Sequence, residues 1–296
     1  MKKLIGASAL LALSATSFSF VPALAAVPAA DYGYSMANTL SDSVGSSTLT
    51  PAPICSSPAT EDLCNVTAEF GTNANGNFWH WTTTQGNGGG AALVTGAPLG
   101  ETYSITVKFS LDELSNEEDP SKYSKIFDFK NLADDTGIYA FGEASPYYIY
   151  TDLESSDTAI ALGEVVEMTI VRDASVTPAL FTLYLKTPTG FQKAFEAEDP
   201  DGIYIAANSG SGSVLRLFQE EPEDAGQSHE GVKEGHLYGI EAWRNLALTE
   251  EQVREASGDE ALGETGADQD KLLLVAGFGV ATVVLGLAIA GRRRRV

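Results

Sequence analysis

Residues 102–111 read TYSITVKFSL. Its large apolar side chains include Tyr103, Ile105, Val107 and Phe109, which recur at every second position. Successive side chains of an extended strand point to opposite faces, so these four share one face. The stretch therefore predicts a long strand that presents one face to a hydrophobic core.

Shorter strand-like runs follow along the chain, with turn clusters rich in Asp, Pro, Thr and Gly between them. The runs lie at residues 124–129, 137–141, 147–150, 165–171, 180–185, 203–205, 214–218 and 237–240. The turn clusters include residues 134–137, 187–190 and 199–202. Many short strands without intervening helices favour antiparallel pairing. We therefore predict an all-β, antiparallel two-sheet sandwich over residues 65–258.

The sandwich is expected to close with a strand and a short capping helix. Residues 240–253 read IEAWRNLALTEEQV, in which Thr249 fits the N-cap and Gln252 the third helical position of a capping box. Gly258 can end such a helix. We expect Trp243 to be buried in the core.

This closing stretch resembles the last strand and helix of laminin-G-like domains, within the class of concanavalin A-like lectins and glucanases. Residues 125–129 and 137–139 are similar to the two central strands of those domains. Residues 167–172 and 183–185 are similar to the strand and hairpin that follow them. The resemblance implies a concanavalin A-like jelly roll, a fold that serves recognition of glycan or protein ligands. It also implies that Trp243 packs between the two sheets and that the capped helix seals one end of the sandwich.

The N-terminus has the three parts of a secretory signal. Lys2 and Lys3 precede an apolar stretch at residues 4–20, and residues 23–25 form a small-x-small cleavage site. We predict a signal peptide over residues 1–25 and an exported chain.

The C-terminus predicts an anchor. Residues 272–291 carry no charge and are long enough to cross a bilayer, and the four arginines within residues 292–296 place that tail in the cytoplasm. The linker of residues 259–271 contains an L-x-x-T-G pentapeptide: Leu262, Gly263, Glu264, Thr265 and Gly266. It resembles the L-P-x-T-G sorting signal of wall-anchored proteins in Gram-positive bacteria, where a sortase cuts between Thr and Gly and joins the Thr to a cell-wall amine.

The pentapeptide departs from that signal at Gly263, where proline is usual, which points to a non-standard sortase class. The resemblance implies sortase and peptidoglycan as partners and a location in the cell wall, reached through a single-span membrane intermediate. The alternative is a plain single-span membrane protein in which the pentapeptide has no role.

Residues 26–64 form a Ser/Thr/Pro-rich segment with few large apolar side chains. We expect an extended lead-in that the fold does not need, at least over residues 27–50. Cys55 and Cys64 are the only cysteines. In an exported chain they predict a disulfide that closes a small loop.

Charge and motifs limit the function. With 18 basic and 40 acidic side chains and a net charge of -22, the chain lacks the basic footprint of a nucleic-acid binder. A glycosidase needs two carboxylates on one face, whereas Glu164 and Glu167 fall on opposite faces of a strand. We therefore expect a non-enzymatic protein for adhesion or recognition, with a glycan or a host or neighbouring surface protein as its ligand. The alternatives are a surface glycoside hydrolase or lyase with a divergent active site, and a purely structural wall protein.

The sequence contains candidate residues for two kinds of binding site, one for sugars and one for calcium. Trp79, Trp81 and Tyr148 are candidates for a sugar-stacking platform, although Trp79 and Trp81 share one strand face and also fit the core. Calcium prefers carboxylate and carbonyl oxygens. The acidic residues in predicted loops that could supply them are Asp134, Asp135, Glu221, Glu223 and Asp224. The alternative for these acids is a solvated exterior without a specific ion.

Overall fold

The computed structural model describes residues 26–51, 66–83, 88–114, 123–134, 136–141, 147–149, 160–220 and 231–259. Four predictions concern residues outside this part of the chain and remain predictions: the signal peptide, the disulfide between Cys55 and Cys64, the sorting signal and the C-terminal membrane span. No helix within the described part of the chain is long and apolar enough to span a bilayer.

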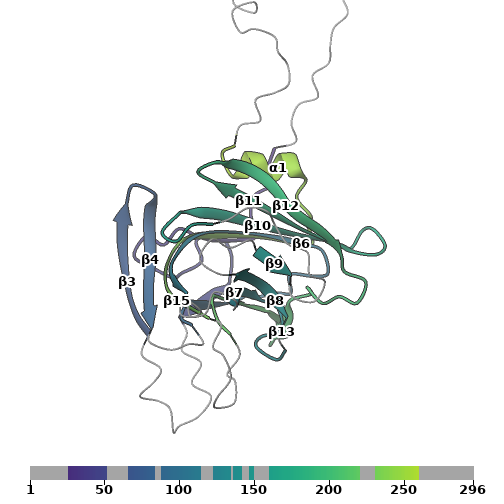
Figure 1. Ribbon diagram of the computed structural model, residues 1–296. Coiled ribbons are helices and arrows are strands. Elements are labelled where there is room, and N and C mark those ends of the chain that lie inside the picture. Colours follow the sequence, from purple (N-terminus) through teal and green to yellow (C-terminus); the bar gives the residue numbers. More distant parts are fainter. Residues whose placement is uncertain are drawn as a thin grey trace, which may run out of the picture.

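Two antiparallel sheets pack face to face, with one short helix outside them (Figure 1). Sheet A has the order β12 (Gly190–Glu198), β11 (Leu180–Thr187), β10 (Val166–Asp173), β6 (Tyr103–Leu114), β15 (Val232–Arg244), β4 (Gly76–Thr83) and β3 (Val66–Asn73), and β1 (Tyr32–Tyr34) also pairs with β15. Sheet B has the order β2 (Thr48–Pro51), β5 (Ala91–Val94), β14 (Gly212–Leu217), β7 (Tyr123–Asp128), β8 (Gly137–Phe141) and β9 (Tyr147–Ile149), and β13 (Ala207–Ser209) also pairs with β14. The prediction of an all-β, two-sheet antiparallel sandwich is confirmed for the described residues.

The predicted long strand is the central strand β6. Tyr103, Ile105, Val107 and Phe109 are all fully buried and belong to the main core between the sheets. β6 pairs with β10 on one side and β15 on the other, so its backbone donors and acceptors are satisfied inside the sheet. The period-two pattern therefore identified both the strand and its buried face.

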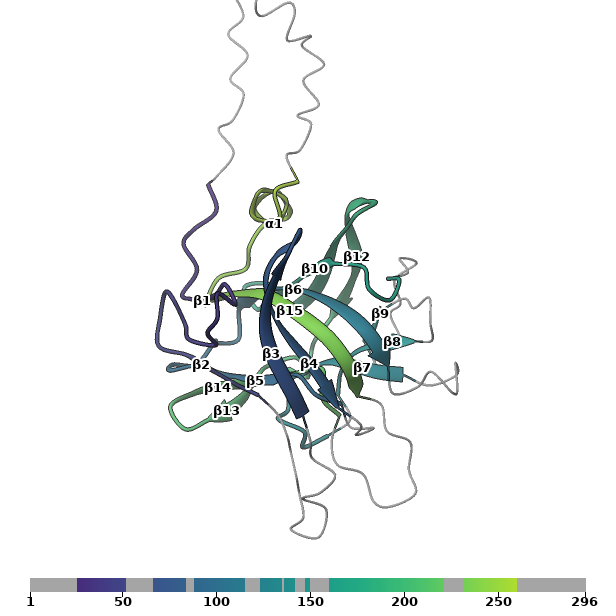
Figure 2. The same ribbon diagram turned by 90° about the vertical axis from the view of Figure 1, so that its left-hand side faces the viewer.

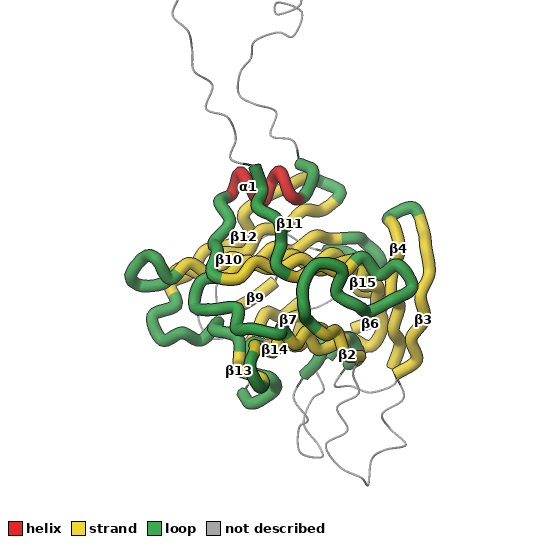
Figure 3. Tube along the Cα trace, turned by 180° about the vertical axis from the view of Figure 1, so that it is seen from behind, coloured by secondary structure: helices red, strands yellow, loops and turns green. Residues whose placement is uncertain are grey.

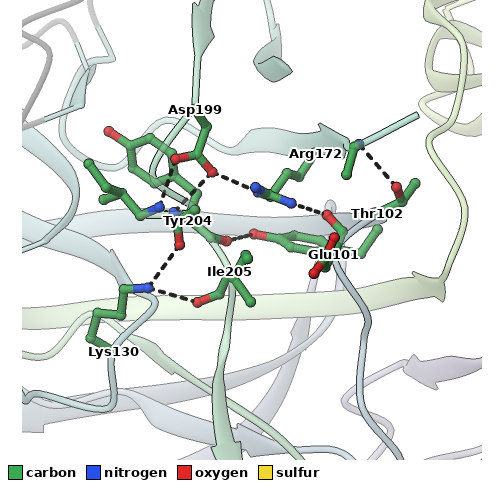
Figure 4. Close-up of polar contacts among 11 residues, drawn as sticks. Glu101, Thr102, Lys130, Arg172, Asp199, Tyr204 and Ile205 are labelled. Atoms are coloured by element: carbon green, nitrogen blue, oxygen red, sulfur yellow. Dashed lines mark hydrogen bonds and ion pairs between the residues drawn. The ribbon is translucent and has the colours of Figure 1, made fainter. Parts of the chain in front are cut away.

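A buried ion pair fixes the loop that leads from β12 in sheet A to β13 in sheet B (Figure 4). Arg172 Nε of β10 donates to Asp199 Oδ2 at 2.7 Å, and the side chains are 3% and 0% exposed. Asp199 Oδ1 accepts the backbone N–H of Ile203 at 2.7 Å. The Tyr103 hydroxyl donates to the carbonyl of Tyr204 at 2.5 Å. These bonds join the loop to the central strands of sheet A.

The expectation of a dispensable lead-in is wrong for residues 32–51. β1 pairs with β15 in sheet A, with Tyr32 opposite Ala242, and β2 pairs with β5 in sheet B. Tyr34 and Met36 are 4% and 0% exposed. The segment has few large apolar side chains, but four of them, Tyr32, Tyr34, Met36 and Leu49, are buried in the core.

The carboxylate of Asp42 holds this segment in shape. Its Oδ1 accepts the backbone N–H groups of Gly33, Val44 and Gly45 at 2.9–3.0 Å, and its Oδ2 accepts the N–H and hydroxyl of Ser47. Partial burial favours the neutral acid, but the hydrogen bonds from Gly45, Ser47, Gly33 and Val44 outweigh it and lower the pKa of Asp42 to about 2. The turn is thus built around an ionised carboxylate.

The capping helix forms as predicted. α1 (Glu250–Ala256) has Thr249 as N-cap, whose hydroxyl accepts the N–H of Gln252 at 3.3 Å, and Gln252 Oε1 accepts the N–H of Thr249 at 2.9 Å. Gly258 follows with a positive φ of 66° that glycine adopts easily. The capping box is therefore complete.

The position of the helix and of Trp243 differs from the expectation. Trp243 is buried, but not between the sheets: it lies in a second cluster with Val171, Tyr184, Leu248 and Val253. This cluster lies on the outer face of sheet A, and Val253 of α1 packs into it; Figure 3 shows α1 beside β11 and β12. Trp243 is paired with Ser104 rather than with the inward Ile105, and this register turns its ring away from the main core.

Met36→Ala should lower the free energy of unfolding by about 2–5 kcal/mol, because the side chain is removed from a closed core. Deletion of residues 27–50 should destabilise the protein further, since it removes one strand from each sheet. Urea unfolding measures both. Val44→Ala is the matched control, because Val44 lies in the same segment and is 59% exposed. Equal stability of Met36→Ala and Val44→Ala would contradict this account of the segment.

Candidate functional site

The β3–β4 hairpin borders the outer face of sheet A. In Figure 1 it stands up at one edge of the sheet, and α1 lies over the opposite part; Figure 2 shows β3 and β4 in front of β15 and β6. Its turn bends over the face, because Asn73 Nδ2 donates to the Tyr238 hydroxyl at 3.1 Å and Lys108 Nζ donates to the carbonyl of Asn75 at 3.2 Å. Side chains from β4, β15 and β6 are therefore collected beside the hairpin.

Four rings form the centre of this surface, and we call them the ring cluster: Phe78, His80, His236 and Tyr238. Since Trp79 and Trp81 point inward, Phe78 and His80 must point outward. His236 lies opposite His80 in the β15–β4 register, and the two imidazoles stack with centroids 4.5 Å apart. Phe78 meets His236 edge-on at 4.7 Å.

Each imidazole is held by a carboxylate. His80 Nε2 is 2.8 Å from Glu234 Oε1, and His236 Nδ1 is 2.6 Å from Asp112 Oδ2. The side chains of His80 and His236 are 19% and 24% exposed, and that of Glu234 is 35% exposed. The rings are thus fixed in orientation while remaining partly open to solvent.

Glu167 of β10 lies further across the same face. Its cross-strand neighbours are Lys108 on β6 and Lys186 on β11. Burial raises the pKa of Glu167 to about 6, with a smaller contribution from the charge of Glu241, and the two lysines only partly oppose this. Close to neutral pH this carboxyl can therefore exist in both protonation states.

The arrangement suits recognition of a polar ligand. Ring edges and faces offer apolar contact, while amide, hydroxyl, ammonium and carboxylate groups around them offer hydrogen bonds in fixed positions. Gly71 of β3 makes room for the Phe78 ring, since a Cβ there would lie 2.3 Å from its Cζ atom.

The structure corrects the hypothesis that Trp79 and Trp81 form a sugar platform. They are 2% and 0% exposed and stack on each other with centroids 5.6 Å apart, and Trp81 also stacks on Phe218 at 4.7 Å. Their ring faces are occupied by other core side chains. Tyr148 lies in β9, but its side chain is outside the described part of the chain.

The calcium hypothesis remains a prediction. Asp134 is an exposed loop residue after β7, while Asp135, Glu221, Glu223 and Asp224 are outside the described residues. Among the described residues, no three His, Cys, Asp or Glu side chains converge in a way that could hold a metal ion.

The run of residues 78–81 is aromatic enough to suggest a binding surface, but nothing in the sequence joins Phe78 and His80 to His236 and Tyr238. The alternation of residues 78–81 was enough to place Phe78 and His80 on the face opposite the tryptophans. The partners His236 and Tyr238 come from a strand more than 150 positions away in the chain. Only the register between β4 and β15 shows that these residues meet.

No protein-family model and no curated protein sequence matches the chain. Among solved structures, the binding domain of botulinum neurotoxin serotype D superposes with a TM-score of 0.47 at 10% identity, over 79% of this chain and 52% of that one. The PL-14 alginate lyase from Aplysia kurodai gives 0.42 at 7% identity, over 67% and 98%. A Lotus tetragonolobus seed lectin gives 0.35 at 11% identity, over 62% and 94%. The match spans about half of the botulinum binding-domain chain. No function follows from likenesses at this level.

Glu167→Gln should stabilise the protein at neutral pH. The pKa of Glu167 is raised from 4.5 to about 6, so the folded state holds the proton more tightly than the unfolded chain. The stability that this group contributes is complete below pH 4.5 and is lost as the pH rises through 6. The variant should gain up to about 2 kcal/mol at pH 7 and little at pH 4. Urea unfolding across this range tests the change, with the exposed Glu198→Gln as control, and an unchanged pH profile in Glu167→Gln would contradict it.

Proposed function

We propose that this chain is an exported surface protein whose outer face of sheet A binds uncharged glycans. The ring cluster carries the proposal, because it combines three partly open rings, those of Phe78, His80 and His236, with fixed hydrogen-bonding groups. Pyranose rings offer an apolar face for contact with aromatic side chains and hydroxyls for polar groups, so both features of the site have a counterpart in the ligand.

The charge of the face favours a neutral ligand. Asp112, Glu234, Glu167 and Glu241 lie on or beside it, and the whole chain has a net charge of -22. Lys108 is engaged with Asn75 O, and Lys186 is engaged with Asp259. Anionic sugars such as sialic or uronic acids would meet net repulsion here.

The proposed location of this domain at the cell surface is inferred from the two terminal segments. We propose that the signal peptide exports the chain, that a sortase cuts after Thr265, and that peptidoglycan becomes the covalent anchor. The support is the order of pentapeptide, uncharged span and arginine tail in the sequence. Two alternatives to glycan recognition have to be tested: that the domain binds a protein ligand, and that it is a structural wall protein without a ligand.

A glycan array probed with the purified protein, with and without calcium, tests the binding proposal. Neutral glycans should bind and acidic ones should not, and Phe78→Ala and His236→Ala should each weaken binding about tenfold or more, which corresponds to about 1.4 kcal/mol. Phe70→Ala is the matched control, since Phe70 lies on the same hairpin, is 37% exposed and points to the opposite face.

Binding confined to acidic glycans, or an equal effect of Phe70→Ala and Phe78→Ala, would reject this site. The absence of binding to any glycan would favour a protein ligand or a structural role. Release of shorter sugars from a bound glycan would instead favour the hydrolase alternative.

The anchoring proposal is tested by fractionating cells that express the full chain. The wild type should resist detergent extraction and be released by enzymes that digest the wall, while Thr265→Ala should stay in the detergent-soluble membrane fraction. A wild type that detergent extracts completely, with its arginine tail still attached, would rule out sorting.

A further inference from the structure

Three charged side chains lie buried together on the outer face of sheet B, away from the ring cluster. Lys125 and Asp128 of β7 are both 0% exposed, and Glu220, just after β14, is 2% exposed. Lys125 Nζ is 3.4 Å from Asp128 Oδ2 and 3.0 Å from Glu220 Oε1. Burial of an ammonium among carboxylates is unusual, because each charge loses its hydration.

A β-bulge produces this arrangement. Residues three positions apart in a regular strand point to opposite faces, but the register of β7 against β8 shifts between Lys125 and Phe127. Lys125 is consequently paired with Tyr139, and Asp128 is paired with Arg216, both on the face away from the core. The bulge brings the amine and the carboxyl together.

Contacts to both of its oxygens orient the carboxyl group of Asp128. Oδ1 accepts the backbone N–H groups of Lys130 at 3.1 Å and Leu132 at 2.8 Å. Oδ2 is the oxygen that faces Lys125 Nζ. Two N–H donors on one oxygen can stabilise negative charge that develops there during attack on the carbon.

We propose that Lys125 and Asp128 react with each other to form an intramolecular amide bond. The neutral Nζ attacks Cγ of the protonated carboxyl, the Nζ–Cγ bond forms and the Cγ–Oδ2 bond breaks. Oδ2 leaves as water, carrying the carboxyl proton and one proton from Nζ. Oδ1 remains as the amide oxygen on its two N–H donors, and the reaction needs no oxidant or other reactant.

The surroundings assist each part of this step. Glu220 is within hydrogen-bond distance of Nζ and can accept its proton and pass it to the leaving oxygen. The reaction requires both groups neutral, and transfer of a proton from Nζ to Oδ2 along their 3.4 Å contact produces that state. The loss of hydration of two buried charges favours this transfer. The Tyr139 ring lies 5.2 Å from Nζ and covers it. The product replaces two buried charges with one neutral amide.

Tryptic digestion and mass spectrometry of the full-length wild-type protein test the bond. Because trypsin needs a free lysine side chain, the linked chain should yield one peptide of residues 123–130, lighter than its sequence by one water, about 18 Da. Fragmentation should place the loss between Lys125 and Asp128. Cleavage after Lys125, with residues 126–130 released at full mass, would overturn the proposal.

Three variants separate the chemistry from folding. Lys125→Arg should give only unlinked peptides. Asp128→Asn should give the same linked peptide as the wild type, because ammonia leaves in place of water. Glu220→Gln should remain largely unlinked while its circular dichroism matches the wild type. Full linkage in Glu220→Gln would overturn the role of Glu220 as proton carrier, and an unlinked Asp128→Asn in a folded protein would count against the reaction itself.

Discussion

The structure depends on the pairing of β6 with β10 and β15 at the centre of sheet A. All three strands are hydrogen-bonded to neighbours within the sheet. Successive side chains of each strand therefore point alternately to the inward and the outward face of sheet A. The inward face supplies Tyr103, Ile105, Val107 and Phe109 to the core. The outward face of the same strands supplies Lys108, Glu167 and His236 to the candidate site. One register thus sets both the stability of the sandwich and the composition of its exposed surface.

The polar side chains on the two outer faces of the sandwich differ in their exposure to solvent. On sheet A, the carboxylates that hold His80 and His236 are partly solvent-exposed, so the rings remain accessible. On sheet B, Lys125 and Asp128 are closed off from water altogether. A half-open polar surface favours reversible contact with a ligand, whereas a sealed one favours internal chemistry, because water neither solvates the charges nor competes in the reaction.

Secondary-structure elements that are defined by a pattern of neighbouring residues could be predicted from the sequence. The alternation of residues 102–111 identified β6, and the capping box at Thr249 and Gln252 identified the start of α1, because each signal is complete within a few neighbouring residues. The segment of residues 32–51 was misjudged, since composition counts apolar residues but does not reveal that Tyr34 and Met36 are buried. Trp243 was correctly expected to be buried, but its face depends on the register of β15 against β6.

Sequence alone was enough to predict the class of fold and the helix cap and to establish the acidic character, because these depend on composition or on residues close together in the chain. Tertiary structure alone decided which polar side chains meet. His80 and His236 come together through the β4–β15 register, and Lys125 and Asp128 through a bulge that changes which way a strand residue points. Both are outcomes of strand pairing, and a shift of one residue sends every side chain to the other face, so no local pattern could have predicted either site.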